Sequence, residues 1–159
     1  MARATHRIQL DGRHIDGSRS SCLGRHVTSI LNVLEPLLED ITWYCADVRT
    51  NRPDASAWPA ATAEVVSIGS TSDFLERVSR VDQFESGVFL ALLRVGSSPN
   101  IRHDPATEDP PFSELGDAVV EMRAFDTSYI ELYARGIALL EPLASRFDVD
   151  VERQDPDRG

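Results

Sequence analysis

The sequence predicts an α+β domain, and two patterns carry this prediction. Segments with alternating apolar residues, typical of strands, take turns with segments whose apolar residues recur every three or four positions, typical of amphipathic helices. We expect a two-layer sandwich with a mixed or mostly antiparallel sheet of about five to six strands and about three helices on one face. The 159 residues are 42% hydrophobic, enough for one globular domain, which we place at residues 1–152 before a flexible tail at 153–159.

The first strand and the first helix are expected near the N-terminus. The segment HRIQL, residues 6–10, reads as a short strand that ends at an Asp-Gly turn signal. Apolar residues then recur three and four apart over residues 23–38, with an N-cap expected at Ser20 or Ser21. Pro36 should kink this helix or restart its last turn.

The middle of the chain predicts strands on both sides of a second helix. Residues 41–50 are rich in β-branched and aromatic side chains and predict a strand, whereas residues 51–62 lack periodicity and predict a loop. A short strand at 64–68 should lead into a helix that presents Phe74 to the core. The nearly continuous apolar run at 86–96 predicts the most buried, central strand of the sheet.

A β-hairpin is expected in the stretch MRAFDTSYIELYAR, residues 122–135. Apolar residues fall on one face of each flanking segment, so the polar triplet at 126–128 lies where an antiparallel hairpin must reverse. Asp and Ser favour turns because their side chains bond nearby backbone N–H groups, so we interpret the triplet as a turn and not as a catalytic cluster. A helix at 137–147, bent by Pro142, and an edge strand at 149–151 should close the domain.

The composition limits the possible partners. A formal net charge of −10 and an isoelectric point near 4.7 argue against binding to nucleic acid or to anionic membranes, which needs a basic face. All 16 basic residues are Arg, through codon bias or through a use for bidentate pairing with carboxylates. Only two cysteines are present, with neither an apolar signal segment nor a membrane-length apolar run, so we expect a cytoplasmic protein.

The longest irregular segment, residues 97–116, is the first candidate for an interaction surface. Loops of this length in compact domains are usually functional or disordered. Residues 104–117, which run one residue past the end of this segment, contain five acidic residues and no Arg. The acidic residues are Asp104, Glu108, Asp109, Glu114 and Asp117.

Two small groups could carry chemistry. Cys22 and His26 are four residues apart and would share a helix face, but zinc needs one or two further ligands and no second paired motif follows. His103 and Asp104 could form an acid/base pair, yet adjacent residues rarely orient one another, and no nucleophile elbow is present. We therefore predict neither a metal or cofactor site nor catalytic residues.

Charged residues on the strands could also converge. Asp47 and the residues around the hairpin, Glu121, Arg123, Asp126 and Glu131, would come together if their strands are neighbours. Cross-strand pairing on an exposed sheet face is the ordinary explanation. The functional alternative is a charged recognition face for a partner.

The arrangement resembles small bacterial α+β proteins, some of which are immunity proteins of polymorphic or contact-dependent toxin systems. The resemblance lies in the element order, in WYCADV after a long helix, and most specifically in FDTSYIELYAR before a closing helix. It implies a non-enzymatic protein that neutralises a cognate toxin, such as a basic nuclease-like effector, by occluding its active or substrate-binding face through an acidic surface. The expected partner-binding residues are Asp104, Glu108, Asp109, Glu114, Asp117, Glu121, Asp126, Tyr129, Glu131 and Tyr133.

Two other classes of function stay open. A small-molecule-binding protein or an accessory subunit would show an exposed apolar patch. A small hydrolase-like enzyme would show a pocket with convergent polar groups near residues 97–116.

Overall fold

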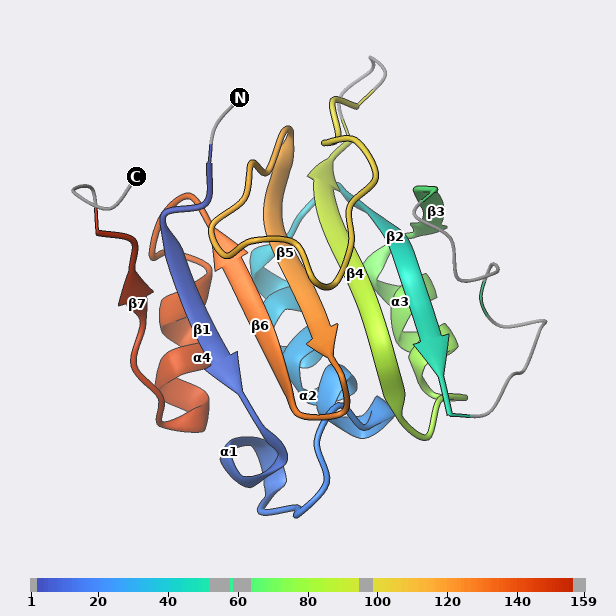
Figure 1. Ribbon diagram of the computed structural model, residues 1–159, viewed down its shortest axis with the longest axis vertical. Helices are drawn as coiled ribbons and strands as arrows, with labels where there is room; N and C mark the ends of the chain where they lie inside the picture. Colours follow the sequence, from blue (N-terminus) through green and yellow to red (C-terminus); the bar gives the residue numbers. More distant parts are fainter. Residues whose placement is uncertain (1–2, 52–57, 59–63, 95–98, 156–159) are drawn as a thin grey trace.

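A computed structural model describes residues 3–51, 58, 64–94 and 99–155 of the chain. In these residues the fold is α+β, as predicted, with seven strands and four helices in place of the expected five to six and three (Figure 1). The strands are β1 His6–Leu10, β2 Ile41–Thr50, β3 Val66–Gly69, β4 Phe84–Leu93, β5 Ala118–Phe125, β6 Tyr129–Ala134 and β7 Glu152–Arg153. The helices are α1 Gly12–Asp16, α2 Gly24–Leu34, α3 Thr71–Val78 and α4 Leu140–Phe147, with a short 3₁₀ turn η1 at Glu35–Leu37.

The seven strands form one sheet in the order β3-β2-β4-β5-β6-β1-β7, and every neighbouring pair is antiparallel. The apolar run expected as the central strand is β4, which lies between β2 and β5 and is buried on both faces. The β5–β6 hairpin matches the prediction. Asp126 and Thr127 both have positive φ, which suits the tight reversal between these strands.

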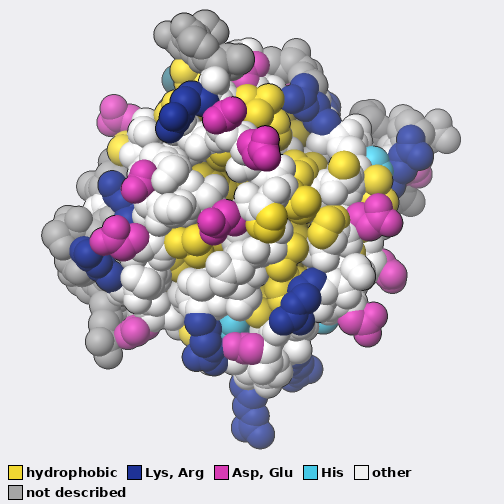
Figure 2. All heavy atoms as spheres, turned by 180° about the vertical axis from the view of Figure 1, so that it is seen from behind, with side chains coloured by type: hydrophobic (Ala, Val, Ile, Leu, Met, Phe, Trp, Pro, Cys, Tyr) yellow, Lys and Arg dark blue, Asp and Glu magenta, His cyan; other side chains and the backbone are white. Residues whose placement is uncertain are grey.

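Helices α2, α3 and α4 cover one face of the sheet, here called the helix face (Figure 1). Inward residues of the strands, such as Trp43, Phe89 and Met122, pack against Leu31 and Phe74 of these helices in one apolar core. Seen from this side, apolar side chains still show between scattered Asp, Glu and Arg side chains (Figure 2).

Several helix boundaries differ from the predictions. The added helix α1 begins where only a turn was expected, because the Asp11 carboxylate caps it by accepting from the backbone N–H groups of Arg13 and His14. Helix α2 begins after Leu23 and not at Ser20 or Ser21. The Ser21 hydroxyl instead accepts from the Gly12 N–H at 2.9 Å.

The two prolines that were expected to bend helices, Pro36 and Pro142, both lie at helix ends. Pro36 restarts the chain as a 3₁₀ turn after α2, one of the two expected outcomes. Pro142 does not bend a helix, because α4 begins only at Leu140 and a proline in the first turn removes no intrahelical hydrogen bond. The last strand is Glu152–Arg153 and not 149–151, so Arg153 of the expected tail pairs with β1; residues 156–159 lie outside the described part.

The opposite face of the sheet is covered by residues 99–117, here called the strap, and this side is called the strap face. The strap holds neither a helix nor a strand apart from one isolated bridge between Arg3 and Glu114, and it crosses in front of β4, β5 and β6 (Figure 1). Phe112 and Leu115 of the strap pack on Leu90 and Tyr133 of the sheet in a second, smaller apolar cluster. The expected two layers are therefore joined by a partial third.

Candidate functional site

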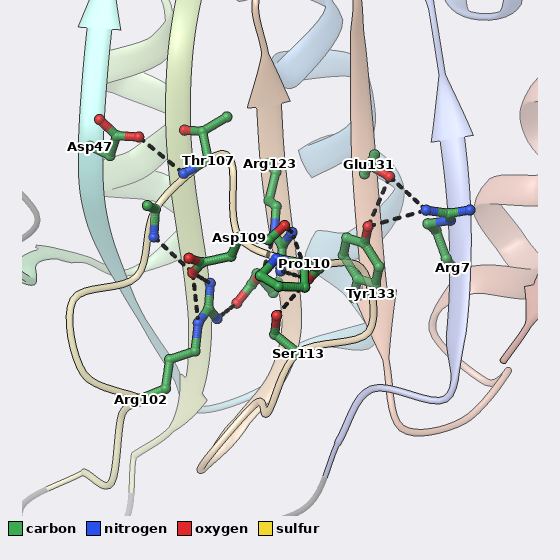
Figure 3. Close-up of polar contacts among 12 residues, drawn as sticks. Arg7, Asp47, Arg102, Thr107, Asp109, Pro110, Ser113, Arg123, Glu131 and Tyr133 are labelled. Atoms are coloured by element: carbon green, nitrogen blue, oxygen red, sulfur yellow. Dashed lines mark hydrogen bonds and ion pairs between the residues drawn. The ribbon is translucent and has the colours of Figure 1, made fainter. Parts of the chain in front are cut away.

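The strap lies over a row of buried charged residues that cross the sheet (Figure 3). Arg123 of β5 is 1% exposed, and its Nε donates to Glu121 Oε2 at 2.6 Å. Its Nη1 also donates to the backbone oxygen of Asp109 at 2.7 Å, and Nη1 and Nη2 each lie 3.3 Å from the oxygen of Pro110. A guanidinium of the sheet thus holds the backbone of the strap.

Arg102 ties the strap to the same carboxylate. Its Nε and Nη2 donate to Asp109 Oδ2 at 3.1 and 2.7 Å, and its Nη1 forms an ion pair with Glu121. Two Arg side chains therefore share Glu121, and the planar guanidinium of Arg102 contacts two carboxylates at once. Such geometry is available to Arg and not to Lys, so it is one use for the Arg-only composition.

The row continues to β6 and β1. Arg7 Nη1 donates to Glu131 Oε2 at 3.1 Å, and the Tyr133 hydroxyl donates to the same oxygen at 2.8 Å. The Arg7 guanidinium also lies 5.1 Å from the ring centre of Phe112, and that of Arg123 lies 4.6 Å from the ring centre of Tyr133. Each of these two arginines is thus placed between a carboxylate and an aromatic ring.

Burial shifts the acid–base behaviour of this row. It lowers the pKa of Arg102 and of Arg123 and raises the pKa of the Tyr133 hydroxyl to about 12. For Arg7, burial alone would lower the pKa, but hydrogen bonds to Tyr133 and Glu152 outweigh it and raise the pKa above its ordinary value. The ion pairs and hydrogen bonds of this row hold the strap in position on the sheet.

At the hairpin end of the same face, an open cleft of about 430 Å³ lies between the strap and the sheet. We call it the acidic cleft. Its charged lining consists of four carboxylates and one guanidinium, and each carboxylate comes from a different segment of the chain. The lining residues are Asp47, Arg49, Glu85, Ser86, Ala106, Thr107, Glu108, Phe125 and Asp126.

Asp47 anchors the strap beside the cleft. It lies in an irregular step of β2 between Ala46 and Arg49, with φ of 54°. Asp47 Oδ2 accepts from the Thr107 N–H at 3.0 Å (Figure 3). The Asp47 backbone oxygen accepts from Ser86 Oγ at 2.6 Å, and Thr107 Oγ1 accepts from the Gly87 N–H at 3.1 Å. Strap, β2 and β4 are thereby locked together at the cleft wall.

The other three carboxylates of the cleft are open to a ligand. Glu85, Glu108 and Asp126 are exposed, and within the described residues their side chains make neither a hydrogen bond nor an ion pair. Phe125 lines the cleft and stacks on Tyr129, with ring centres 5.1 Å apart and planes at 15°. The cleft thus offers unpaired negative charge next to an aromatic surface.

The structure separates the ten predicted partner-binding residues into two groups. Glu121, Glu131 and Tyr133 are buried beneath the strap, at 0%, 7% and 1% exposure, so they support the fold and do not form a partner surface. The prediction failed there because alternating polar residues on a strand look solvent-exposed until a distant segment covers them. The residues that stay exposed or half-buried are Asp104, Glu108, Asp109, Glu114, Asp117, Asp126 and Tyr129.

Those remaining residues are not all in one place. Glu108 and Asp126 meet in the acidic cleft, whereas Glu114 lines a second recess of about 300 Å³ beside Arg3. Asp109 is engaged with Arg102, and Asp117 Oδ2 accepts from the Asn100 N–H at 2.7 Å. Asp104 is exposed and pairs with His103 at 2.9 Å.

Of the five strand residues that could converge, Asp47 and Asp126 line the cleft, whereas Glu121, Arg123 and Glu131 lie beneath the strap. Glu85 and Arg49 also line the cleft but were not proposed as site residues. Their only signal is their place on β2 and β4, whose pairing depends on the strand order. Sequence periodicity does not contain that order.

Cys22 and His26 do not form a metal pair. Cys22 precedes α2, so it does not share a helix face with His26, and its Sγ donates to the Tyr129 backbone oxygen; His26 is fully buried. His26 Nδ1 accepts from the Leu23 N–H and its Nε2 lies 3.0 Å from Asp16 Oδ1. Burial raises the pKa of Cys22 to about 12 and that of Cys45 to about 11, so both are thiols at neutral pH.

The described part of the chain contains neither a metal-binding cluster nor a membrane-spanning helix. No cluster of three or more His, Cys, Asp or Glu residues there is arranged to hold a metal ion. None of the helices described has the length and apolar character needed to cross a bilayer.

Comparison with known proteins adds no family. No protein-family model matches the chain, and searches of curated proteins and of solved structures give no significant match.

Proposed function

We propose that this chain is a protein-binding inhibitor, an immunity protein that neutralises a cognate toxin by occluding a basic active or substrate-binding face. The observation that carries the proposal is the acidic cleft, in which four carboxylates from four separate segments face one opening with a single Arg. Unpaired carboxylates that a fold brings together repel one another, and a basic partner relieves that repulsion.

The support of the strap favours this role. Glu108 lies on an irregular segment, yet the residues on both sides of it, Thr107 and Asp109, are held by hydrogen bonds to Asp47 and Arg102. A surface that is rigid before binding loses less conformational entropy when the partner docks. Opposite charge also accelerates encounter, which suits an inhibitor that must capture a toxin before it acts.

A small-molecule site is the second candidate, because a cleft of about 430 Å³ has the volume of a ligand pocket. Such pockets are mostly apolar, whereas charged groups make up five of the nine lining residues of this one. The chemistry of the lining therefore favours a basic protein surface.

The test is affinity capture of the tagged full chain from its native cells at low and at moderate salt, with identification of the captured proteins by mass spectrometry. We expect one stoichiometric cationic protein that is toxic when expressed alone and harmless when expressed with this chain. The triple variant Glu85→Gln, Glu108→Gln, Asp126→Asn should lose capture and protection, because it removes the unpaired charge and leaves Asp47 in place.

The matched control removes three exposed carboxylates elsewhere: Glu35→Gln, Glu39→Gln and Glu141→Gln, at or near the ends of α2 and α4. This variant has the same net charge as the cleft variant and should keep capture and protection. If both variants lost capture equally, net charge and not the cleft would explain binding, and the cleft would not be the binding site. Capture of the chain without any partner at both salt concentrations would contradict the inhibitor function itself.

A further inference from the structure

We propose that the contact made in the acidic cleft is an arginine side chain of the partner protein, with its guanidinium lying on the Phe125–Tyr129 ring pair and pairing with the surrounding carboxylates. This inference rests on the proposed function and specifies the chemistry of its partner. It follows from an uncovered part of the sheet, from the way the same face holds its own arginines, and from charge complementarity.

The strap leaves the hairpin end of the strap face partly uncovered. Ser86, Phe125 and Tyr129 are half-buried there, and Ser86 pairs with Phe125, which pairs with Tyr129, across three neighbouring strands. Phe125 lines the acidic cleft, and its ring is stacked on that of Tyr129 beside the cleft. The strap covers Glu121 and Arg123. Within the described residues, no segment covers the hairpin end of the sheet face in the same way.

The covered part of the same face shows how this sheet binds guanidinium groups. Arg123 lies between Glu121 and the ring of Tyr133, and Arg7 lies between Glu131 and the rings of Phe112 and Tyr133. Each time, a carboxylate that accepts a hydrogen bond from the guanidinium is combined with an aromatic ring whose centre lies within about 6 Å of it. The cleft repeats this combination with Glu85, Asp126 and Phe125, and leaves room for a side chain from outside.

Charge complementarity selects the occupant. Arg49 offsets one of the four carboxylates of the cleft, so a net negative charge remains for a cation. A guanidinium meets both demands of this site, because it pairs with two carboxylates in its plane and stacks on an aromatic ring. An ammonium group satisfies the charge but has no flat face to place on the ring pair.

The experiment uses the full ¹⁵N-labelled chain and three capped tripeptides that differ only in the central residue: Ac-Gly-Arg-Gly-NH₂, its Lys counterpart and its citrulline counterpart. Citrulline keeps the shape of Arg without the charge. We expect the Arg peptide to shift backbone amide signals of Ser86, Thr107, Phe125 and Asp126 saturably, and to bind roughly threefold more tightly than the Lys peptide. The citrulline peptide should produce no saturable shift.

Two variants separate the ring from the charge. Phe125→Leu should weaken binding of the Arg peptide and abolish the preference for Arg over Lys. Asp126→Asn, which tolerates the positive φ of this position, should weaken both charged peptides, and Glu35→Gln should weaken neither. The amide spectrum of each variant reports whether it folds.

The two proposals can fail separately. Equal affinity for Arg and Lys peptides, or shifts spread over the surface, would overturn the arginine assignment even if a toxin is captured through the cleft carboxylates. A localised Arg preference without any captured toxin would support the arginine assignment and contradict the immunity function.

Discussion

Different interactions stabilise the two faces of this sheet, although the same strands form both: apolar packing on the helix face and ion pairs on the strap face. On β5, Met122 points to the helix face and lies in an apolar core, whereas its neighbours Glu121 and Arg123 point to the strap face and lie in an ion-paired row. All three are essentially fully buried. Apolar burial is tolerant of orientation, but a buried charge must meet a particular partner at a particular distance.

This difference explains what each face is suited for. Regular helices cover the apolar face, because an amphipathic helix buries a broad stripe without directed contacts. An irregular strap covers the charged face, because its backbone carbonyls can accept from Arg123 only where they are not used in a helix or sheet. The charged row thereby holds a loop in one conformation and fixes the wall of the acidic cleft.

Removing one member of the buried charge row should have the largest effect. Arg123→Ala should lower the free energy of unfolding by about 3–5 kcal/mol, because it deprives buried Glu121 of one partner and leaves the carbonyls of the strap unpaired. Urea denaturation followed by circular dichroism measures the loss. The double variant Arg123→Met, Glu121→Leu should recover at least half of it, since no uncompensated charge remains.

The helix face provides the control for that rescue. Met122→Ala should cost about 2–5 kcal/mol through the cavity that it leaves, and Glu121→Leu should not relieve this cost because the two side chains face opposite layers. A double variant Arg123→Met, Glu121→Leu as unstable as Arg123→Ala would mean that shape, and not charge, holds the strap.

Alkaline pH should lower the free energy of unfolding through groups on both faces. We expect an effect smaller than that of the core variants and larger than that of an exposed ion pair. The folded chain holds the protons of Cys45 and Tyr133 to pKa values of about 11 and 12, whereas the unfolded chain releases them near 9 and 10. Between these values the folded form binds more protons, so these two groups leave the unfolding free energy unchanged up to about pH 9 and lower it as the pH rises further. Each group contributes up to roughly 1.4 kcal/mol per pH unit.

Denaturation midpoints measured from pH 8 upward, in about half-unit steps, test this window. Cys45→Ala should reduce the decline that begins near pH 9, to which Cys22 also contributes because its pKa is raised to about 12. Tyr133→Phe should reduce the decline that begins near pH 10 and reports on the strap face. A decline of unchanged slope in both variants would assign the alkaline sensitivity to other groups.

The smallest effect is expected where an ion pair is exposed. Glu76 and Arg80 pair at 3.1 Å on the helix side, with side chains 71% and 58% exposed. Arg80→Ala should cost less than about 0.5 kcal/mol in the same urea assay, because solvent screens the pair and ordering two long side chains is unfavourable. A cost close to that of Arg123→Ala would remove burial as the difference between the two pairs.

The order of the elements was predictable because its signals are local. The alternation around the 126–128 turn and the helical spacing of residues 23–38 depend only on neighbours in the chain, and the matching strands and helices are present. The burial of Glu121, Glu131 and Tyr133 was not predictable, because it depends on a strap that lies on the sheet through contacts with distant residues.

The site was predictable in part for the same reason. Glu108 and Asp126 are conspicuous as acids in a loop and a turn, and both line the acidic cleft. Glu85 acquires its role only because β4 lies between β2 and β5, so that strands distant in the chain place Asp47, Glu85 and Asp126 around one opening. The same strand order makes the cleft a property of the whole sheet.

The ends of the strap are tied to each other. Asp117 N–H donates to the Asn100 backbone oxygen and Asn100 N–H donates to the Asp117 carboxylate, each at 2.7 Å. A segment closed at its base in this way is an Ω-loop, whose length and composition can change at little entropic cost to the rest of the domain. Evolution or an engineer can therefore exchange the exposed residues between these two anchors, such as Glu108, and alter recognition, while Arg102, Asp109 and Phe112 hold the loop on the sheet.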